Sequence, residues 1–257
     1  MSCRRIQAEV LESAPAAADT FRLRLRAPDV AREARPGQFV MLGPIDHGAL
    51  DPFLPRPFSI HRAGPDGDLE LLYALVGRVT RDMARLAPGR RVGLLGPQGT
   101  GFSAAGTGEL WLVAGGLGVA PLVFLAEREA PRRKVRLFYG VRSADRAVPL
   151  LRLQEAGVAI DLATDDGSAG SPGTVAQRIE AAGPPPAGAV IAACGPWKML
   201  RAIHSLAARW DTPLELSLET RMACGMGACL GCAIQLAVGR RRVCLDGPVF
   251  DGREVFG

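Results

Sequence analysis

Lysine and aromatic side chains are scarce in this chain. Lys134 and Lys198 are the only lysines among its 257 residues, and aromatic residues make up 5%. The basic residues behind the formal net charge of +5 are therefore almost all arginines, spread along the chain without interleaved aromatic residues. Proteins that bind single-stranded nucleic acid combine a basic groove with aromatic side chains on which bases stack. We therefore expect no nucleic-acid partner.

The sequence also lacks a secretory signal and a clear membrane span. M-S-C-R-R-I-Q-A-E-V carries a basic pair, but no apolar stretch follows it. The uncharged run at 110–126 contains Gly115, Gly116, Gly118 and Pro121, which suit a strand, a turn and a helix start better than one membrane helix. We expect a cytoplasmic protein without a membrane span, where reducing conditions disfavour disulfides.

The first hundred residues have the pattern of a small barrel. F-R-L-R-L-R-A at 21–27 alternates apolar and charged side chains with the period of a strand. Further apolar runs of strand length, separated by proline and glycine, occupy 37–42, 56–60 and 69–76. Many short strands at near-regular spacing predict an antiparallel barrel.

From about residue 108 strands and helices alternate. E-L-W-L-V-A and V-R-L-F-Y-G-V are apolar runs typical of strands covered on both faces, with the helical stretch P-L-V-F-L-A-E-R-E-A between them. A-I-D-L-A-T and A-V-I-A-A-C-G-P repeat the strand pattern, each with a helix after it. This succession predicts a parallel α/β sheet, followed after Pro213 by a cysteine-rich segment.

Four of the six cysteines lie close together near the end of the sequence. Cys224, Cys229, Cys232 and Cys244 give the spacing C-x4-C-x2-C-x11-C, which matches the plant-type arrangement for a two-iron cluster. Glycines between the first three cysteines allow the tight turns that such a loop needs. A four-cysteine zinc site is the alternative, but it usually shows two short-spaced pairs. The spacing favours the cluster and leaves zinc open.

Three further motifs carry weaker signals. R-P-F-S at 56–59 offers a guanidinium for a pyrophosphate and a hydroxyl for a flavin ring, although four residues alone are weak evidence. A-G-G-L-G-V-A-P-L at 114–122 and A-C-G-P-W-K-M-L at 193–200 each connect a buried strand to a helix, where a nucleotide can approach the backbone. Neither is a G-x-G-x-x-G fingerprint, so a plain packed turn remains open for both.

Taken in order, R-P-F-S, G-P-Q-G-T-G-F, G-G-L-G-V-A-P-L and C-G-P-W-K-M-L resemble the ferredoxin reductase superfamily. The segment S-L-E-T-R-M-A-C-G-M-G-A-C-L-G-C, with R-R-V-C-L-D-G-P-V-F after it, is similar to the electron-transfer subunits of type B dihydroorotate dehydrogenase. The resemblance covers essentially the whole chain. It implies an α+β multidomain fold: an antiparallel β-barrel FAD domain at 1–103, an α/β parallel-sheet NAD domain at 104–212 and a small iron-sulfur domain at 213–257.

The resemblance also implies site residues, position by position. The family's usual glycine-threonine contact to FAD is Val79 and Thr80 here, so only the threonine matches. The implied FAD contacts are Arg56, Pro57, Phe58, Ser59, Leu72, Tyr73, Ala74, Val79 and Thr80. The implied contacts to the nicotinamide nucleotide are Gly115, Gly116, Gly118, Pro121, Cys194, Gly195 and Pro196. The implied ligands of a 2Fe-2S cluster are Cys224, Cys229, Cys232 and Cys244.

Electron transfer is the function that follows from this resemblance. A nicotinamide gives two electrons at once and a cluster accepts one, so FAD belongs between them. We expect NADH, FAD and the cluster to exchange electrons with the FMN of a dihydroorotate dehydrogenase catalytic subunit, in a complex of two plus two chains. No catalytic acid or base is expected from this chain.

Two alternatives remain open from the sequence. A related flavin and iron-sulfur reductase could serve another oxidoreductase, such as a hydrogenase or glutamate synthase type. A zinc-stapled binding module without redox function is the other. NADPH in place of NADH also stays open from the residues alone, because Arg142, Ser143 and Arg146 could meet a 2′-phosphate that Asp145 would oppose. The family resemblance favours NADH.

Overall fold

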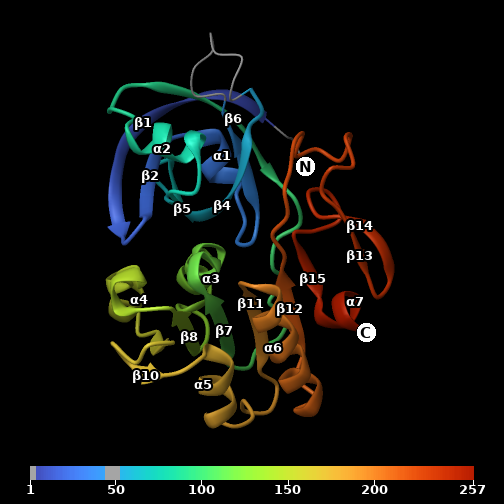
Figure 1. The fold of residues 1–257 in the computed structure, drawn as a ribbon. Coiled ribbons are helices and arrows are strands. Elements are labelled where there is room, and N and C mark those ends of the chain that lie inside the picture. The colour runs from blue at the N-terminus through green and yellow to red at the C-terminus, as the bar shows by residue number, and fades with distance from the viewer. Residues whose placement is uncertain (1–3, 44–52) are drawn as a thin grey trace.

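The computed structural model describes residues 4–43 and 53–257. In Figure 1 a barrel lies above a sheet with helices on both of its faces, and a carboxy-terminal segment runs along one side of both. Helix α3 (Val119–Glu129) lies between the barrel and the sheet and packs against strand β4 (Arg56–Ala63) of the barrel. This arrangement confirms the predicted pair of units, an antiparallel barrel and a parallel sheet.

The barrel closes with six antiparallel strands in the order β1-β2-β5-β4-β3-β6. Alternation in β2 places Leu23 and Leu25 in the core and arginines outside, as the period of two predicted. The strands are β1 (Arg4–Ala17), β2 (Thr20–Arg26), β3 (Phe39–Leu42), β4, β5 (Asp68–Ala74) and β6 (Arg91–Gln98). Two short helices cover the ends of strands: α1 (Pro28–Glu33) and α2 (Arg78–Ala84).

The second unit is a seven-stranded sheet in the order β10-β9-β8-β7-β11-β12-β15. All neighbours pair in parallel except β12 and β15. The strands are β7 (Leu110–Gly115), β8 (Val135–Val141), β9 (Ala159–Thr164), β10 (Ser171–Pro172), β11 (Val190–Cys194), β12 (Leu214–Ser217) and β15 (Val249–Asp251). The helices are α3, α4 (Leu151–Glu155), α5 (Val175–Ala181) and α6 (Trp197–Arg209).

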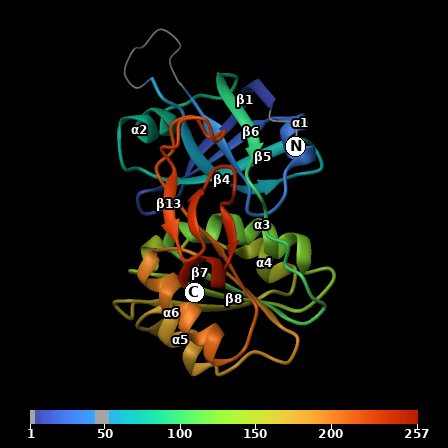
Figure 2. The ribbon, with the colours of Figure 1, turned by 90° about the vertical axis from the view of Figure 1, so that its right-hand side faces the viewer.

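The carboxy-terminal segment joins the sheet and the barrel. Its own hairpin consists of β13 (Ala233–Leu236) and β14 (Gly239–Arg242), and the chain ends in α7 (Gly252–Phe256). Figure 2 shows this segment in front of both other units. Because β12 and β15 both lie after residue 212 and belong to the seven-stranded sheet, part of the expected iron-sulfur domain is built into the nucleotide unit. The boundaries at 103 and 212 stay predictions.

The cores follow the same arrangement. One apolar cluster fills the barrel, and a second lies on the sheet face that α3 covers. The third lies under α5 and α6 on the other face, and it includes Cys232 and Cys244 of the carboxy-terminal segment and Phe39 and Met41 of the barrel. The cysteine-rich segment is therefore anchored in a core shared by all three parts of the chain. No helix among residues 4–43 and 53–257 is long and apolar enough to cross a membrane.

Candidate flavin, nucleotide and cluster sites

A cavity of about 280 Å³ lies where the barrel, the start of α3 and the carboxy-terminal segment meet. Its barrel wall contains most of the expected FAD contacts, which are Pro57, Phe58, Ser59, Leu72, Tyr73, Ala74 and Thr80. Strands β4 and β5 are antiparallel neighbours and place all of these side chains together except Thr80, which lies in α2. The opposite wall contains Leu117, Ala120, Leu218, Glu219, Thr220, Met222 and Pro248. A mainly apolar cavity with a few hydroxyl groups suits the ring system of a flavin.

Thr220 gives this cavity an unsatisfied polar group. Its Oγ1 is buried and has no hydrogen-bond partner within the described part of the chain. A buried hydroxyl without a partner costs free energy, and a ligand that hydrogen-bonds to it removes that cost. The cavity therefore fits a bound cofactor with a polar ring edge.

Tyr73 lies deeper than the family resemblance implied. Its side chain is only 2% exposed, and its hydroxyl is within 3.3 Å of Ser13 Oγ, which donates in turn to the carbonyl of Met83. Its ring meets Phe58 edge to face at 5.9 Å between centroids. Burial raises the pKa of Tyr73, partly offset by the contact with Ser13. Tyr73 therefore supports Phe58 from the barrel core and presents little of its own surface to the cavity.

Two expected FAD contacts, Arg56 and Val79, do not line the cavity, whereas Thr80 does. Arg56 donates from Nη1 to the carbonyl of Leu54 at 2.7 Å and does not line the cavity. Val79 packs in the barrel core, also away from the cavity wall. Thr80 lines the cavity, and its Oγ1 accepts hydrogen bonds from the backbone N–H groups of Val76 and Gly77 at 3.0 and 3.1 Å. Thr80 thus fixes the start of α2 beside the cavity.

A larger cavity, of about 810 Å³, opens at the carboxyl ends of β7, β8 and β11. Strand ends of this kind are where ligands of open α/β sheets bind. Five expected nucleotide contacts line it: Gly115, Gly116, Gly118, Gly195 and Pro196. The other two, Pro121 and Cys194, are buried beside it in α3 and β11. Burial raises the pKa of the Cys194 thiol well above its usual value, so this thiol stays protonated.

Glycine is required where the turn after β7 meets the end of β11. A Cβ on Gly118 would overlap the carbonyl of Cys194, and a Cβ on Gly115 would lie 2.7 Å from Sδ of Met199. Gly195 adopts a φ of +157°, which side chains rarely allow. By contrast, Gly116 has open space around its Cα, so nothing blocks the approach of a ligand to its backbone. The amino end of α3 begins directly after this turn, as a diphosphate site requires.

The residues that could select between NADH and NADPH do not all reach the cavity. Arg142 lines it, together with Asp165 from the T-D-D-G-S segment and Lys198. Ser143 donates to Asp145, and Arg146 pairs with Asp19 at 3.4 Å. Of the three candidates only Arg142 lines the cavity, and Asp165 lines it as well.

The two cavities share one wall, made by Leu117, Leu218 and Glu219. Leu117 lies in the turn before α3, and the other two follow β12. The surrounding protein raises the pKa of the Glu219 carboxyl above its ordinary value. A nucleotide and a flavin bound in these cavities would therefore meet at this wall, with one titratable group beside both.

The four clustered cysteines form two pairs beside the flavin cavity. Sγ of Cys232 and Sγ of Cys244 lie 3.2 Å apart in the core, and the thiols of Cys224 and Cys229 contact each other nearer the surface. Met222 and Pro248, which line the flavin cavity, are close in sequence to the first and last of these cysteines. The cysteine-rich loop is therefore the immediate neighbour of the flavin cavity.

Backbone N–H groups surround the sulfur atoms. Cys224 Sγ accepts from Met226 N and Cys229 N at 3.5 and 3.4 Å, and Cys244 Sγ accepts from Gly227 N at 3.1 Å. Burial alone would raise the pKa of Cys224, but these donors lower it to about 7. For Cys244, burial and the neighbouring Cys232 raise the pKa to about 12.

This arrangement fits a two-iron cluster. Such a cluster would be held by four cysteine thiolates, and the loop presents Cys232 with Cys244 and Cys224 with Cys229 as two pairs of thiols. Amide donors to sulfur are the usual outer-shell support of such a cluster. Among the described residues no three Cys, His, Asp or Glu side chains are arranged around a single metal ion.

Comparison with known proteins identifies the family. Residues 219–256 match the family described as the iron-sulfur cluster binding domain of dihydroorotate dehydrogenase B. The electron transfer subunit of dihydroorotate dehydrogenase B (NAD(+)) from Desulforamulus reducens is 38% identical over 255 residues, covering 96% of this chain and 97% of that one. The subunit of the same name from Caldanaerobacter subterraneus is 33% identical, over 99% and 96% of the two chains. The chain belongs to the family of dihydroorotate dehydrogenase B electron transfer subunits.

Solved structures agree with this membership. The structure of an NADH-dependent reduced ferredoxin-NADP oxidoreductase superposes with a TM-score of 0.86 at 26% identity, covering 97% of this subunit and 90% of that chain. A ferredoxin NADP+ reductase from Neisseria gonorrhoeae, with bound FAD and NADP, shares the fold at a TM-score of 0.65 and 17% identity, covering 80% and 91% of the two chains. The ferredoxin reductase fold expected from the motifs is thus confirmed.

The structure adds cavity residues to this electron transfer subunit that the motifs did not single out. At the flavin cavity the carboxy-terminal segment adds Leu218, Glu219, Thr220, Met222 and Pro248, and the rest of the chain adds Phe39, Val76, Leu117 and Ala120. Trp197 and Lys198 are added at the nucleotide cavity. S-L-E-T belongs to the family signature. Its position beside the two cavities results from the pairing of β12 with β11, which a local motif does not reveal.

Proposed function

We propose that this chain carries electrons between NADH and the FMN of a dihydroorotate dehydrogenase catalytic subunit. The observation that supports this most is the order of its sites. The nucleotide cavity shares a wall with the flavin cavity, and the flavin cavity borders the cysteine-rich loop. When bound, FAD supplies the conversion between two-electron exchange with NADH and one-electron exchange with the cluster.

The chain's own residues would hold these groups as follows. Phe58, Ser59 and Thr220 would bind the flavin ring, with the hydroxyl groups meeting its polar edge. The turn at 115–118 and the backbone at Gly195 would bind the nucleotide diphosphate. The ligands of the cluster would be Cys224, Cys229, Cys232 and Cys244, two to each iron. Leu117 and Leu218 would exclude water where nicotinamide and flavin meet.

The remaining features of the proposal follow from the names of the relatives. A subunit that transfers electrons needs a catalytic partner, and we propose the FMN-bearing chain in a complex of two plus two. Thiolate ligands and NADH both suit the reducing cytoplasm, where we place the protein. The likeness to an NADH-dependent reduced ferredoxin-NADP oxidoreductase supports one second candidate, a reductase subunit for a different oxidoreductase.

Anaerobic reduction by NADH, followed by visible absorption, tests the proposal. The chain alone should show bleaching of flavin and iron-sulfur bands. With a purified dihydroorotate dehydrogenase catalytic chain, electrons should continue to its FMN, and dihydroorotate should in turn reduce NAD+. Bleaching without transfer to that chain would favour the second candidate. A colourless protein with stoichiometric zinc would overturn both in favour of a zinc-stapled module.

A further inference from the structure

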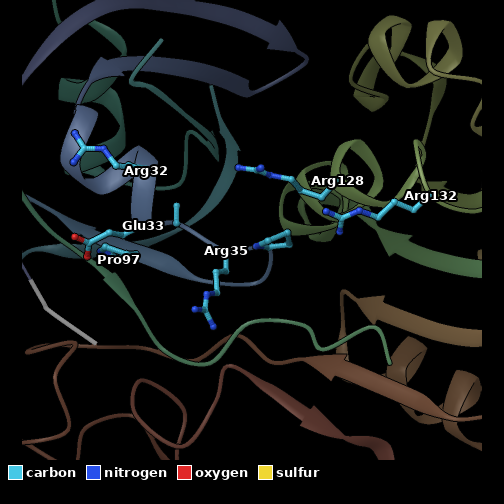
Figure 3. A pocket seen from close by; sticks show the side chains of 8 residues that line it. Arg32, Glu33, Arg35, Pro97, Arg128 and Arg132 are labelled. Atoms are coloured by element: carbon cyan, nitrogen blue, oxygen red, sulfur yellow. The ribbon is translucent and has the colours of Figure 1, made fainter. Parts of the chain in front are cut away.

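We propose that the chain has a third ligand site, which binds an anion with a chain of phosphate groups. A cavity of about 490 Å³ lies between the barrel and the carboxyl end of α3. Figure 3 shows Arg32, Glu33 and Arg35 on the barrel side, and Arg128 and Arg132 on the α3 side. None of the residues that line it lines the flavin or the nucleotide cavity. It is therefore separate from the sites of the proposed function.

The charge of this cavity is strongly positive. Four arginines and one glutamate line it, which gives 4 − 1 = +3. The carboxylate of Glu33 already accepts from Arg4 at 2.7 Å, outside the cavity lining. Arg32 and Arg132 each have a carboxylate within 4 Å, which is Asp29 of α1 for Arg32 and Glu129 at the end of α3 for Arg132.

Two of the arginines carry uncompensated charge. Within the described residues neither Arg35 nor Arg128 forms an ion pair, and the guanidinium of Arg128 lies over the ring of Phe124 at 5.3 Å. Both residues are exposed, so their guanidinium groups are open to an anion that enters the cavity, and guanidinium groups suit phosphate oxygens.

The helix ends explain only part of this arrangement. Cations are favoured in the last turn of a helix, which accounts for Arg32 on α1 and Arg128 on α3. Arg35 follows α1 and belongs to no helix. Its backbone is held in place, because its N–H donates to Gln38 Oε1 at 2.8 Å and the carbonyl of Pro36 accepts from Phe102 N at 2.9 Å. A fixed loop that presents an unpaired arginine to a cavity is a preorganised anion contact.

A phosphate chain fits these contacts better than a single phosphate. Guanidinium groups bind phosphate oxygens in pairs of parallel hydrogen bonds. The arginines come from two walls, and the volume lies within the range of small-molecule sites. Linked phosphates present more oxygens to guanidinium groups on both walls than one phosphate group does. Inorganic polyphosphate and nucleoside triphosphates share this chemistry.

Such an anion would also connect the cavity to the other sites through α3. The helix begins at the nucleotide cavity, where Ala120 also lines the flavin cavity, and it ends at the arginines, about 15 Å away. An anion between Arg35 and Arg128 would therefore hold α3 against the barrel. We expect it to raise the melting temperature of the whole chain.

Titration calorimetry with inorganic triphosphate tests the site, on the chain with FAD and cluster bound and at low ionic strength. Triphosphate should bind at least about tenfold more tightly than orthophosphate, and added salt should weaken binding. The double variant Arg35→Gln and Arg128→Gln should bind triphosphate at least about tenfold more weakly. The matched control is Arg85→Gln with Arg91→Gln, which removes the same charge from exposed positions of the barrel unit and should bind as the parent does.

The outcomes separate this inference from the proposed function. Both double variants should keep their flavin absorption and their reduction by NADH, which shows that they fold. If the Arg35 and Arg128 variant binds triphosphate like the parent, the anion binds elsewhere on the chain and the inference is overturned. Absence of binding by the parent overturns it as well. A nucleoside triphosphate that competes with inorganic triphosphate supports the site and shows that it also accepts a nucleoside.

Discussion

The Sγ atoms of Cys232 and Cys244 lie 3.2 Å apart in the core, whereas Cys229 is exposed. We predict that Cys232→Ser loses iron and sulfide and also lowers the melting temperature, because a hydroxyl then stands in an apolar core at a cost of about 1–3 kcal/mol. Cys229→Ser should impair the cluster with little effect on the stability of the protein without it. Metal analysis and thermal unfolding of the apo forms measure both effects.

FAD should remain bound in these two variants, and NADH should still reduce an artificial dye through it. Transfer to the catalytic chain should be lost. Full iron and sulfide content in Cys232→Ser, or intact coupled turnover in either variant, would contradict the assignment of these cysteines as ligands.

Gly118 lies in the turn after β7, against the end of β11, with no room for a side chain. Gly118→Ala should destabilise the protein by about 1–3 kcal/mol and raise KM for NADH, because the added methyl group overlaps the backbone of Cys194 and moves the nucleotide turn. The matched control is Gly157→Ala, at an exposed position with a φ of +77° and no atom within 4 Å of the added methyl group. It should lower stability by about 1 kcal/mol and leave KM unchanged. Equal KM values in both variants would show that Gly118 does not shape the site.

The sequence predicts the architecture of this chain well, because its strands and helices have clear periods. The predicted ranges agree with the observed ends to within two residues for strands β2, β7, β8, β9 and β11 and for helices α3, α5 and α6. The barrel strands β1 and β6 were missed. In β1 the burial pattern is irregular, since it bends around the barrel and its register with β2 shifts twice. Such bends weaken the period of two.

The candidate sites could be predicted only as far as they coincide with local motifs. Pro57, Phe58 and Ser59 line the flavin cavity and the glycine turn lines the nucleotide cavity, because a strand and a tight turn are determined by neighbouring residues. The long-range pairing of β12 with β11 places Thr220 at the flavin cavity and Glu219 at both cavities. Arg56 could not be placed from sequence either, because its guanidinium is held by the adjacent backbone carbonyls.

Thr220 offers a test of the flavin cavity that separates binding from folding. Its buried Oγ1 has no partner in the described residues, so Thr220→Val should leave the stability of the FAD-free protein unchanged or slightly higher. FAD should bind more weakly, by about 1 kcal/mol or roughly fivefold in Kd, because a hydrogen bond to the cofactor is lost. Fluorescence titration of the apoprotein with FAD measures the change. Thr20→Val, whose hydroxyl bonds the carbonyl of Ala18 away from the cavity, is the control and should bind FAD normally.

Glu219 should make nucleotide binding depend on pH. The surrounding protein raises the pKa of its carboxyl above the ordinary 4.5, so the carboxylate forms only as the pH rises through that higher value. The nicotinamide ring is cationic in NAD+ and neutral in NADH. Affinity for NAD+ should therefore increase as Glu219 ionises, while affinity for NADH stays nearly flat. Glu219→Gln should remove this dependence, and an unchanged pH profile for NAD+ would show that the carboxylate does not face the ring.

The raised pKa of Glu219 also makes the free energy of unfolding depend on pH. Because the carboxyl of Glu219 binds its proton more tightly in the folded state, its contribution to stability is complete below its unfolded pKa and is lost as pH rises through the folded one. The free energy of unfolding of the ligand-free protein should thus fall over this interval relative to that of Glu219→Gln, in which position 219 is uncharged at every pH. Denaturant unfolding of the two proteins across this pH range measures the difference. Parallel curves would mean that the carboxyl titrates in the folded protein as it does in the unfolded chain, so that the cavity wall exerts no effect on it.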